Sequence, residues 1–282
     1  MSLALVTVVH AATNGTDLVK AEMVADSTSI RAGQPFRVAV KFKVEPQWHV
    51  YWSNPGETGQ ATTMKLELPE GFTASDIQYP SPKRFVAAGD IEGYGYEDEV
   101  VLLATITPPA NLSAASQELS ASTSWLVCSD TLCLPGKQKV TIQLPVNAEP
   151  EPANAELFAK WSARVPVKID LAKEVTRAEA QQPESDSETH TFVVQWKQPP
   201  KEVDWFPPAV KVVSFEDVDV QTEGDKTTIT CTARVLTGQK LPAGMLDSVI
   251  VYKDASGEPK GIVVPFELLP SNTAGDTVSR RD

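Results

Sequence analysis

The chain has few of the residues on which most catalytic and metal sites depend. Its 282 residues include three cysteines and three histidines. The histidines, His10, His49 and His190, are too scattered to indicate a Ser-His-Asp triad, and His49 is expected on the face of a strand. Copper(I) could use His49, Met64 and the cysteines, since it suits sulfur ligands, but these residues have no ligand-spaced cluster. We therefore expect no resident metal and no cofactor.

Positive charge and long apolar segments are also scarce. Lys and Arg total 25 against 37 Asp and Glu, which gives a net charge of -12. Because nucleic-acid phosphates attract a basic surface, this balance argues against a nucleic-acid partner. No apolar run reaches the ~18 residues that span a bilayer. The chain is not expected to cross a membrane by itself.

The two ends of the chain lack the pattern of a folded core. Residues 1–16, "MSLALVTVVHAATNGT", join a short apolar run to small residues of the kind that a signal peptidase accepts. We interpret them as the remnant of a secretory leader, with an ordinary first strand as the alternative. A secretory leader implies that the protein functions outside the cytoplasm, where disulfides persist. Residues 271–282 are polar and are predicted to be a tail.

Between the ends, composition and periodicity favour strands over helices. Twenty-two prolines against fifteen glycines, with many Val and Thr, indicate strands joined by turns. The clearest strand is "FRVAVKFKV" (36–44), where apolar residues occupy every second position. Other strands are expected at 48–52, 63–68, 100–106, 118–127, 139–144, 191–197, 209–215, 227–235, 247–253 and 261–268. The spacing predicts an all-β chain with two immunoglobulin-like antiparallel β-sandwich domains in tandem.

Composition also suggests where the two sandwiches divide. The first is predicted at 17–147 and the second, smaller one at 157–270. Residues 148–156, rich in Pro, Ala and acidic side chains, are predicted to be a linker. After it, "AELFAKWSARV" (155–165) predicts a short helix with its three large apolar side chains on one side.

One of the three cysteines reads as a core residue. In "TTITCTARV" (227–235), Cys231 shares a strand face with Ile229, Ala233 and Val235. We predict a buried thiol that acts as a small apolar residue.

The other two cysteines, Cys128 and Cys133, stand close together in "SWLVCSDTLCLPGKQKV" (124–140), with four residues between them. A hairpin here can bring their Cα atoms within disulfide range. If the disulfide is purely structural, a staple, closing so short a loop adds only about 2 kcal/mol to the stability of the fold. A short-loop pair at a sheet edge is also easy to reach and to exchange. The residues alone leave redox exchange, a structural bridge and metal binding open.

Four stretches narrow this choice because they occur together and in order. They are "VEPQWHVYWSNPGETGQATTMKLELPEGF" (44–72), "YPSPKRF" (79–85), "EGYGYEDEVVL" (92–102) and "WLVCSDTLCLPG" (125–136). The combination resembles the periplasmic N-terminal domain of the DsbD family of thiol:disulfide interchange proteins, particularly its longer suppressor-of-copper-sensitivity (ScsB) branch. The resemblance is strong over residues 30–146. The second sandwich resembles, more weakly, the extra domain that precedes the membrane segments in that branch.

The resemblance implies a protein-disulfide reductase module, exported to the periplasm as the ectodomain of a larger inner-membrane protein. Its cysteine pair would take electrons from the membrane-embedded redox domain of the same protein. It would pass them to oxidised periplasmic partners, such as a disulfide isomerase, a thioredoxin-fold protein of copper tolerance or a cytochrome c biogenesis factor. Cys133 would form the mixed disulfide with the partner, and Cys128 would resolve it. The competing class is a non-enzymatic binding protein with a structural disulfide.

The family also shields its pair with a mobile cap loop that bears acidic residues and an aromatic lid. "GDIEGYGYEDE" (89–99) is the matching segment. Asp90 and Glu92 stand near the acidic positions, and Tyr94 or Tyr96 is the nearest substitute for the lid. The alternative is an ordinary Gly/Tyr hairpin turn.

Negative charge is expected near the two sulfurs. Asp130 lies between the cysteines in the sequence, with the cap-loop acids as further sources. Because carboxylates disfavour a thiolate, they raise a thiol pKa. We therefore expect a guarded dithiol that reacts slowly with unselected disulfides and needs a docked partner.

Overall fold

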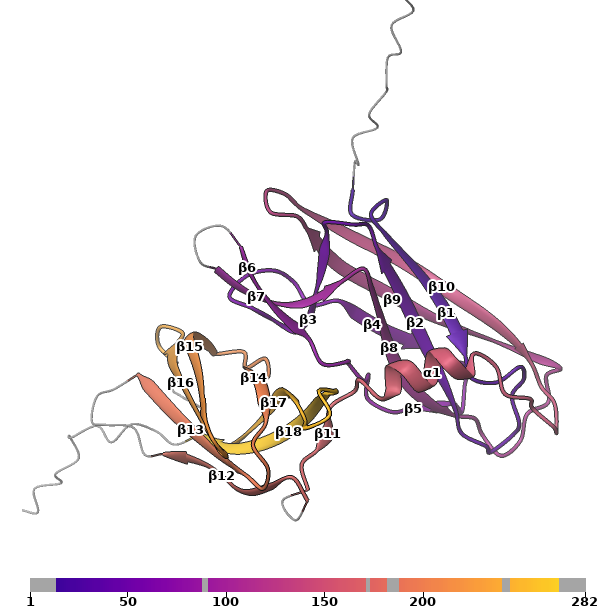
Figure 1. Ribbon diagram of the computed structural model, residues 1–282. Helices are drawn as coiled ribbons and strands as arrows, with labels where there is room; N and C mark the ends of the chain where they lie inside the picture. The colour runs from indigo at the N-terminus through magenta and orange to yellow at the C-terminus, as the bar shows by residue number, and fades with distance from the viewer. Residues whose placement is uncertain (1–13, 88–90, 171–172, 182–187, 240–243, 269–282) are drawn as a thin grey trace, which may run out of the picture. The chain divides into compact units, whose positions relative to one another are not determined.

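The computed structural model describes residues 14–87, 91–170, 173–181, 188–239 and 244–268 (Figure 1). Within these ranges the elements are strands, except for one short helix, α1 (Ala155–Ser162), so the all-β prediction is confirmed. None of the described helical residues forms a span long and apolar enough to cross a bilayer.

By its internal contacts the chain divides into two compact units. The first holds residues 1–51, 60–77 and 96–154, and the second holds 52–59, 78–95 and 155–282. Strands β3 (His49–Gly56) and β7 (Ile91–Glu97) therefore begin in one unit and end in the other.

Two antiparallel sheets form the first unit. One has the order β1-β2-β8-β5, made by β1 (Val19–Ala25), β2 (Phe36–Val44), β8 (Glu99–Thr107) and β5 (Thr73–Ala74). In the other, β9 (Ser116–Cys128) lies between β10 (Cys133–Pro145) and β3, and β4 (Thr63–Glu67) also pairs with β9. Phe42 on β2 meets Trp125 on β9 edge to face, with ring centroids 5.8 Å apart. The two sheets thus bury their facing side chains as a β-sandwich.

The segment that precedes α1 is bound to the first unit. The N–H of Thr28 donates to the carbonyl of Glu151 at 2.9 Å, and the N–H of Ala153 donates to the carbonyl of Asp26 at 2.8 Å. These bonds attach the predicted linker to residues 26–28, which follow the first strand of the first unit. The boundary at 148–156 remains a prediction about which segments fold independently.

The second unit contains two four-stranded sheets. Their orders are β11-β18-β17-β14 and β12-β13-β16-β15. The strands are β11 (Val167–Lys168), β12 (Val175–Gln181), β13 (Thr189–Trp196), β14 (Lys201–Phe206), β15 (Val213–Glu223), β16 (Lys226–Val235), β17 (Gly244–Lys253) and β18 (Pro259–Leu268). Phe192 on β13 packs against Phe266 on β18, with centroids 4.8 Å apart. This unit is therefore a second β-sandwich, to which contacts also assign the hairpin of β6 (Lys83–Ala87) and β7.

Candidate functional site

Strands β9 and β10 form a long hairpin that can be followed in Figure 1. The cysteine pair lies at its turn. Cys128 ends β9 and Cys133 begins β10, and the two residues are direct cross-strand partners. Their Cα atoms are 4.1 Å apart and a disulfide joins their sulfurs. Ser129 closes the turn, since its N–H donates to the carbonyl of Leu132 at 2.8 Å and its Oγ accepts the N–H of Leu132 at 3.3 Å. The turn therefore sets the two sulfurs side by side.

The two cysteines differ in their exposure. Cys128 is 1% exposed, whereas Cys133 is an exposed residue. Beside Cys133, the side chain of Leu132 is 50% exposed, which is unusual for a large apolar residue. A sulfur arriving from solvent can therefore reach Cys133, while Cys128 is shielded by the sandwich.

Strand β3 places two further polar side chains next to the buried sulfur. His49 on β3 is the cross-strand partner of Cys128. The Tyr51 hydroxyl donates a hydrogen bond to Cys128 Sγ at 3.2 Å, and His49 Nε2 lies 3.4 Å from the same hydroxyl oxygen. The His49 and Tyr51 rings also meet edge to face, with centroids 5.2 Å apart. The three residues thus form a chain of contacts from imidazole to sulfur.

Sequence reasoning placed His49 correctly on a strand but missed its contact with the cysteine pair, and it did not consider Tyr51. The period of two along a strand does put His49 and Tyr51 on the same face. That signal did not say which strand lies alongside β3, because strand pairing depends on contacts distant in the sequence.

Burial and two carboxylates set the electrostatics around His49. Burial lowers the pKa of His49, while the carboxylates of Glu97 and Asp130 oppose this by raising it. Asp130 thus lies within electrostatic range of His49, and so does Glu97, an acid that the sequence did not single out. That Asp130 tunes the cysteine pair remains a prediction. Burial also raises the pKa of Tyr51, so the phenol keeps its proton at neutral pH.

The predicted cap loop is found largely as a strand. Asp90 lies outside the described residues, whereas Glu92, Tyr94 and Tyr96 belong to β7. Tyr94 is 1% and Tyr96 6% exposed, so both rings are core residues of a strand. Gly93 leaves room for the Phe85 ring of β6, because a Cβ at Gly93 would come within 2.3 Å of that ring. The expectation of a mobile loop over this segment is therefore wrong for its described part.

Within the second unit, Arg84 engages two of these β7 residues. It forms an ion pair with Glu92, and its guanidinium lies over the Tyr94 ring, 5.2 Å from the centroid. The Tyr94 ring also packs edge to face against Phe206 at 5.2 Å. That Glu92, Tyr94 or Tyr96 shields or tunes the cysteine pair remains a prediction.

The remaining candidates are structural. Cys231 is 1% exposed and burial raises the pKa of its thiol to about 12, which confirms the predicted buried thiol. Among the described residues, no group of three or more His, Cys, Asp or Glu side chains is arranged to hold a metal ion.

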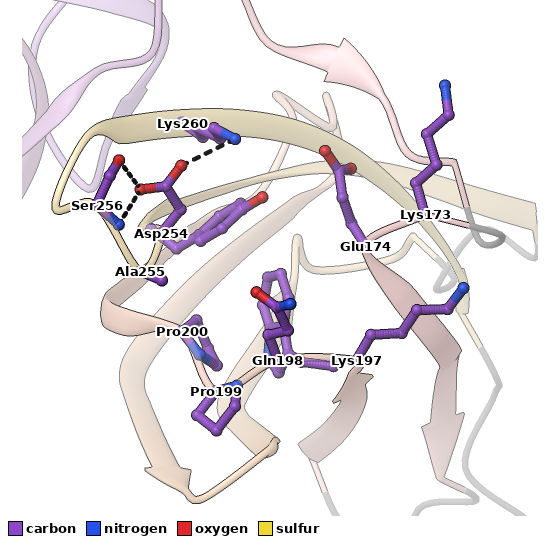
Figure 2. Close-up of a pocket in the computed structure, with 12 residues that line it drawn as sticks. Lys173, Glu174, Lys197, Gln198, Pro199, Pro200, Asp254, Ala255, Ser256 and Lys260 are labelled. Carbon is purple, nitrogen blue, oxygen red and sulfur yellow. Dashed lines mark hydrogen bonds and ion pairs between the residues drawn. The ribbon is translucent and has the colours of Figure 1, made fainter.

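A hollow of about 350 Å³ lies in the second unit, beside Trp196 and Tyr252 (Figure 2). Figure 2 shows the Asp254 carboxylate between Ser256 and Lys260. It accepts the N–H of Ser256 at 2.9 Å and pairs with the Lys260 ammonium at 2.9 Å. Asp254 therefore holds the turn between β17 and β18.

Comparison with known families identifies one that matches more than half of the chain. A family model described as "Thiol:disulfide interchange protein DsbD, N-terminal" matches residues 16–161. The structure is similar to the crystal structure of the N-terminal periplasmic domain of ScsB from Proteus mirabilis, with a TM-score of 0.66 and 18% identity over 89% of this chain and 94% of that one. It also matches the reduced N-terminal domain of DsbD from Neisseria meningitidis, with a TM-score of 0.31 and 10% identity over 50% and 94%. No curated protein matched the chain.

Proposed function

Since the chain belongs to the DsbD N-terminal domain family, we propose that Cys128 and Cys133 form a thiol-disulfide exchange centre and not a structural staple. The observation that carries this proposal is the contrast between an exposed Cys133 and a buried Cys128 across one disulfide. Exchange proceeds by attack of a thiolate on one sulfur, and the rate depends on access to that sulfur. A staple has no need of such a difference, whereas an exchange centre needs one sulfur open to the partner.

The same contrast supports a separate role for each sulfur. In the reduced chain, the Cys133 thiolate attacks the disulfide of an oxidised partner, which forms a mixed disulfide and releases one partner thiolate. Cys128 then attacks Cys133 Sγ, which closes the internal disulfide and releases the second partner thiolate. Two electrons pass to the partner, which is reduced as the Cys128–Cys133 dithiol is oxidised.

The wider setting follows from family membership. We place the chain in the periplasm, as a protein-disulfide reductase module of a larger membrane protein whose embedded redox domain reduces the pair again. Its electron acceptors would be periplasmic disulfide isomerases or thioredoxin-fold proteins, including those of cytochrome c biogenesis or copper tolerance. The ScsB structure that supports this placement is itself described as periplasmic.

The reduction potential of the pair tests this function. The purified chain is equilibrated in glutathione or dithiothreitol buffers of graded potential, and the free thiols are counted by alkylation and mass. We expect a midpoint between about -120 and -270 mV, the span of catalytic pairs. Cys231 is buried and serves as an internal reference for a thiol that does not exchange. A midpoint below about -300 mV, as in structural bridges, would instead make the disulfide a staple.

A further inference from the structure

His49, Tyr51 and Cys128 form a line of polar contacts that ends at the buried sulfur of the disulfide. A buried hydroxyl needs a hydrogen-bond partner, but sulfur in a disulfide is a weak acceptor. A thiolate is a stronger one, because hydrogen bonds to charged groups are roughly twice as strong as those between neutral groups. The contact from Tyr51 to Cys128 therefore gains most when Cys128 carries negative charge.

We propose that Tyr51 and His49 form a proton relay for Cys128, in which Tyr51 touches the reacting sulfur and His49 acts through Tyr51. This inference rests on the exchange function proposed above. Tyr51 is then a catalytic residue of both half-reactions, and His49 is a positioning residue that also takes up the proton.

In the half-reaction that reduces the chain, a thiolate of a donor dithiol attacks the exposed Cys133. A sulfur–sulfur bond forms between donor and Cys133, the Cys128–Cys133 bond breaks, and Cys128 leaves with the electron pair. The Tyr51 hydroxyl already points at this sulfur, 3.2 Å away, and so stabilises the leaving thiolate. An aligned donor of this kind acts where charge develops during the reaction.

In the half-reaction that reduces the acceptor, Cys133 first forms the mixed disulfide and Cys128 must then lose a proton. The Cys128 thiol passes its proton to the Tyr51 oxygen as the hydroxyl proton of Tyr51 moves to His49 Nε2. The Cys128 thiolate attacks Cys133 Sγ, the mixed disulfide breaks, and the acceptor leaves as a thiolate. The proton on His49 then returns to solvent. In the oxidised structure the Tyr51 hydroxyl donates to Cys128 Sγ, which is the direction that this transfer requires once the disulfide has closed.

The groups around His49 suit a proton acceptor. Burial lowers the pKa of His49, so the imidazole is neutral at neutral pH and can accept a proton. Glu97 from β7 and Asp130 from the turn of the β9–β10 hairpin face it and favour the imidazolium once it has formed. Tyr51 keeps its proton because burial raises its pKa, so it transmits a proton without ionising.

The relay is tested by separating the two steps of oxidation with dithiobis(nitrobenzoate), an aromatic disulfide that releases a coloured thiolate at each step. The reduced chain, in a Cys231→Ala background, is mixed with the reagent in a stopped-flow instrument. The first release reports attack by Cys133, and the second reports resolution by Cys128. We expect Tyr51→Phe to leave the first step unchanged and to slow the second by about 10-fold or more, as the loss of a proton-transfer group does.

His49→Gln gives a readout that a structural role would not change, the pH profile of the second step. With His49 present, this rate should rise with pH and level off once His49 is neutral, below its ordinary pKa of 6.5. In His49→Gln it should keep rising between about pH 5 and pH 8, where histidines change charge. His190→Gln, which removes a buried histidine of the second unit, is the matched control and should keep the original profile.

The outcomes separate this inference from the function on which it rests. Normal first and second steps in Tyr51→Phe, with an unchanged profile in His49→Gln, would overturn the relay and leave the exchange centre standing. If the unaltered cysteine pair does not react with the reagent while the chain is folded, the exchange function fails, and the relay fails with it.

Discussion

At the scale of single residues, the exposed Cys133 and the buried Cys128 should behave as different nucleophiles. Reduced Cys128→Ala keeps the accessible thiol but lacks the sulfur that resolves the mixed disulfide. It should therefore form a lasting adduct with oxidised glutathione. Reduced Cys133→Ala should form this adduct at a rate lower by a factor of about ten or more, because exchange rates depend on access to the attacking sulfur.

The adducts are measured by intact mass over time, with Cys231→Ala in both variants so that one cysteine remains in each. Unfolding both variants in urea provides the control, since the two rates should then converge as burial is lost. If the folded Cys133→Ala variant instead trapped glutathione as fast as Cys128→Ala, the roles of the two sulfurs would have to be exchanged.

At the scale of elements, the β9–β10 hairpin depends on one glycine. Gly136 on β10 is the cross-strand partner of Trp125 on β9, and a Cβ at Gly136 would come within 2.3 Å of Trp125 Nε1. Trp125 is 1% exposed and has no room to move aside. Gly136→Ala should lower the free energy of unfolding by about 1–3 kcal/mol, the usual cost of overpacking.

Urea unfolding followed by tryptophan fluorescence measures this effect. Thr141→Ala, an exposed position on the same strand, is the matched control and should change stability by less than about 1 kcal/mol. Equal losses in the two variants would mean that Trp125 is not tightly packed against Gly136.

Whether a strand can be predicted depends on whether its signal lies in its own sequence or in its packing against distant residues. Strand β2 was predicted because its apolar residues alternate, and the structure buries Val38, Val40 and Phe42 completely. Strand β7 was not, because Gly93 and Gly95 leave gaps in the apolar pattern that only a packed neighbour such as Phe85 fills. Local sequence carries the first kind of signal, while the second depends on tertiary packing.

The candidate site divides in the same way. The sequence identified Cys128, Cys133 and Asp130 because they sit within one hairpin turn, so their proximity is a local property. The contact of Tyr51 with Cys128 joins residues 77 positions apart. It exists only once β3 has paired with β9 in a particular register, in which His49 is opposite Cys128. A single sequence contains no local pattern that specifies this register.

At the scale of the whole molecule, the two compact units are not continuous stretches of the sequence. By its contacts, most of the β6–β7 hairpin belongs with the C-terminal sandwich. Arg84 on β6 is central to this arrangement. Its guanidinium pairs with Asp204 on β14 at 2.8 Å, donates to the Trp205 carbonyl at 2.9 Å and also pairs with Glu92. The side chain is only 18% exposed, so these charges interact with little screening.

Arg84→Gln should therefore destabilise the second unit as a whole. It leaves the half-buried carboxylates of Glu92 and Asp204 without their shared cation, at a cost of about 2–4 kcal/mol, near the lower end for a broken buried pair. Hydrogen exchange followed by mass should then quicken both in the hairpin and in β14, while β9 and β10 keep their protection. The matched control is Arg37→Gln, which removes a more exposed ion pair with Asp26 and should cost less than about 1 kcal/mol. Faster exchange confined to the hairpin would show that β6 and β7 unfold on their own, and that the second unit is stable without them.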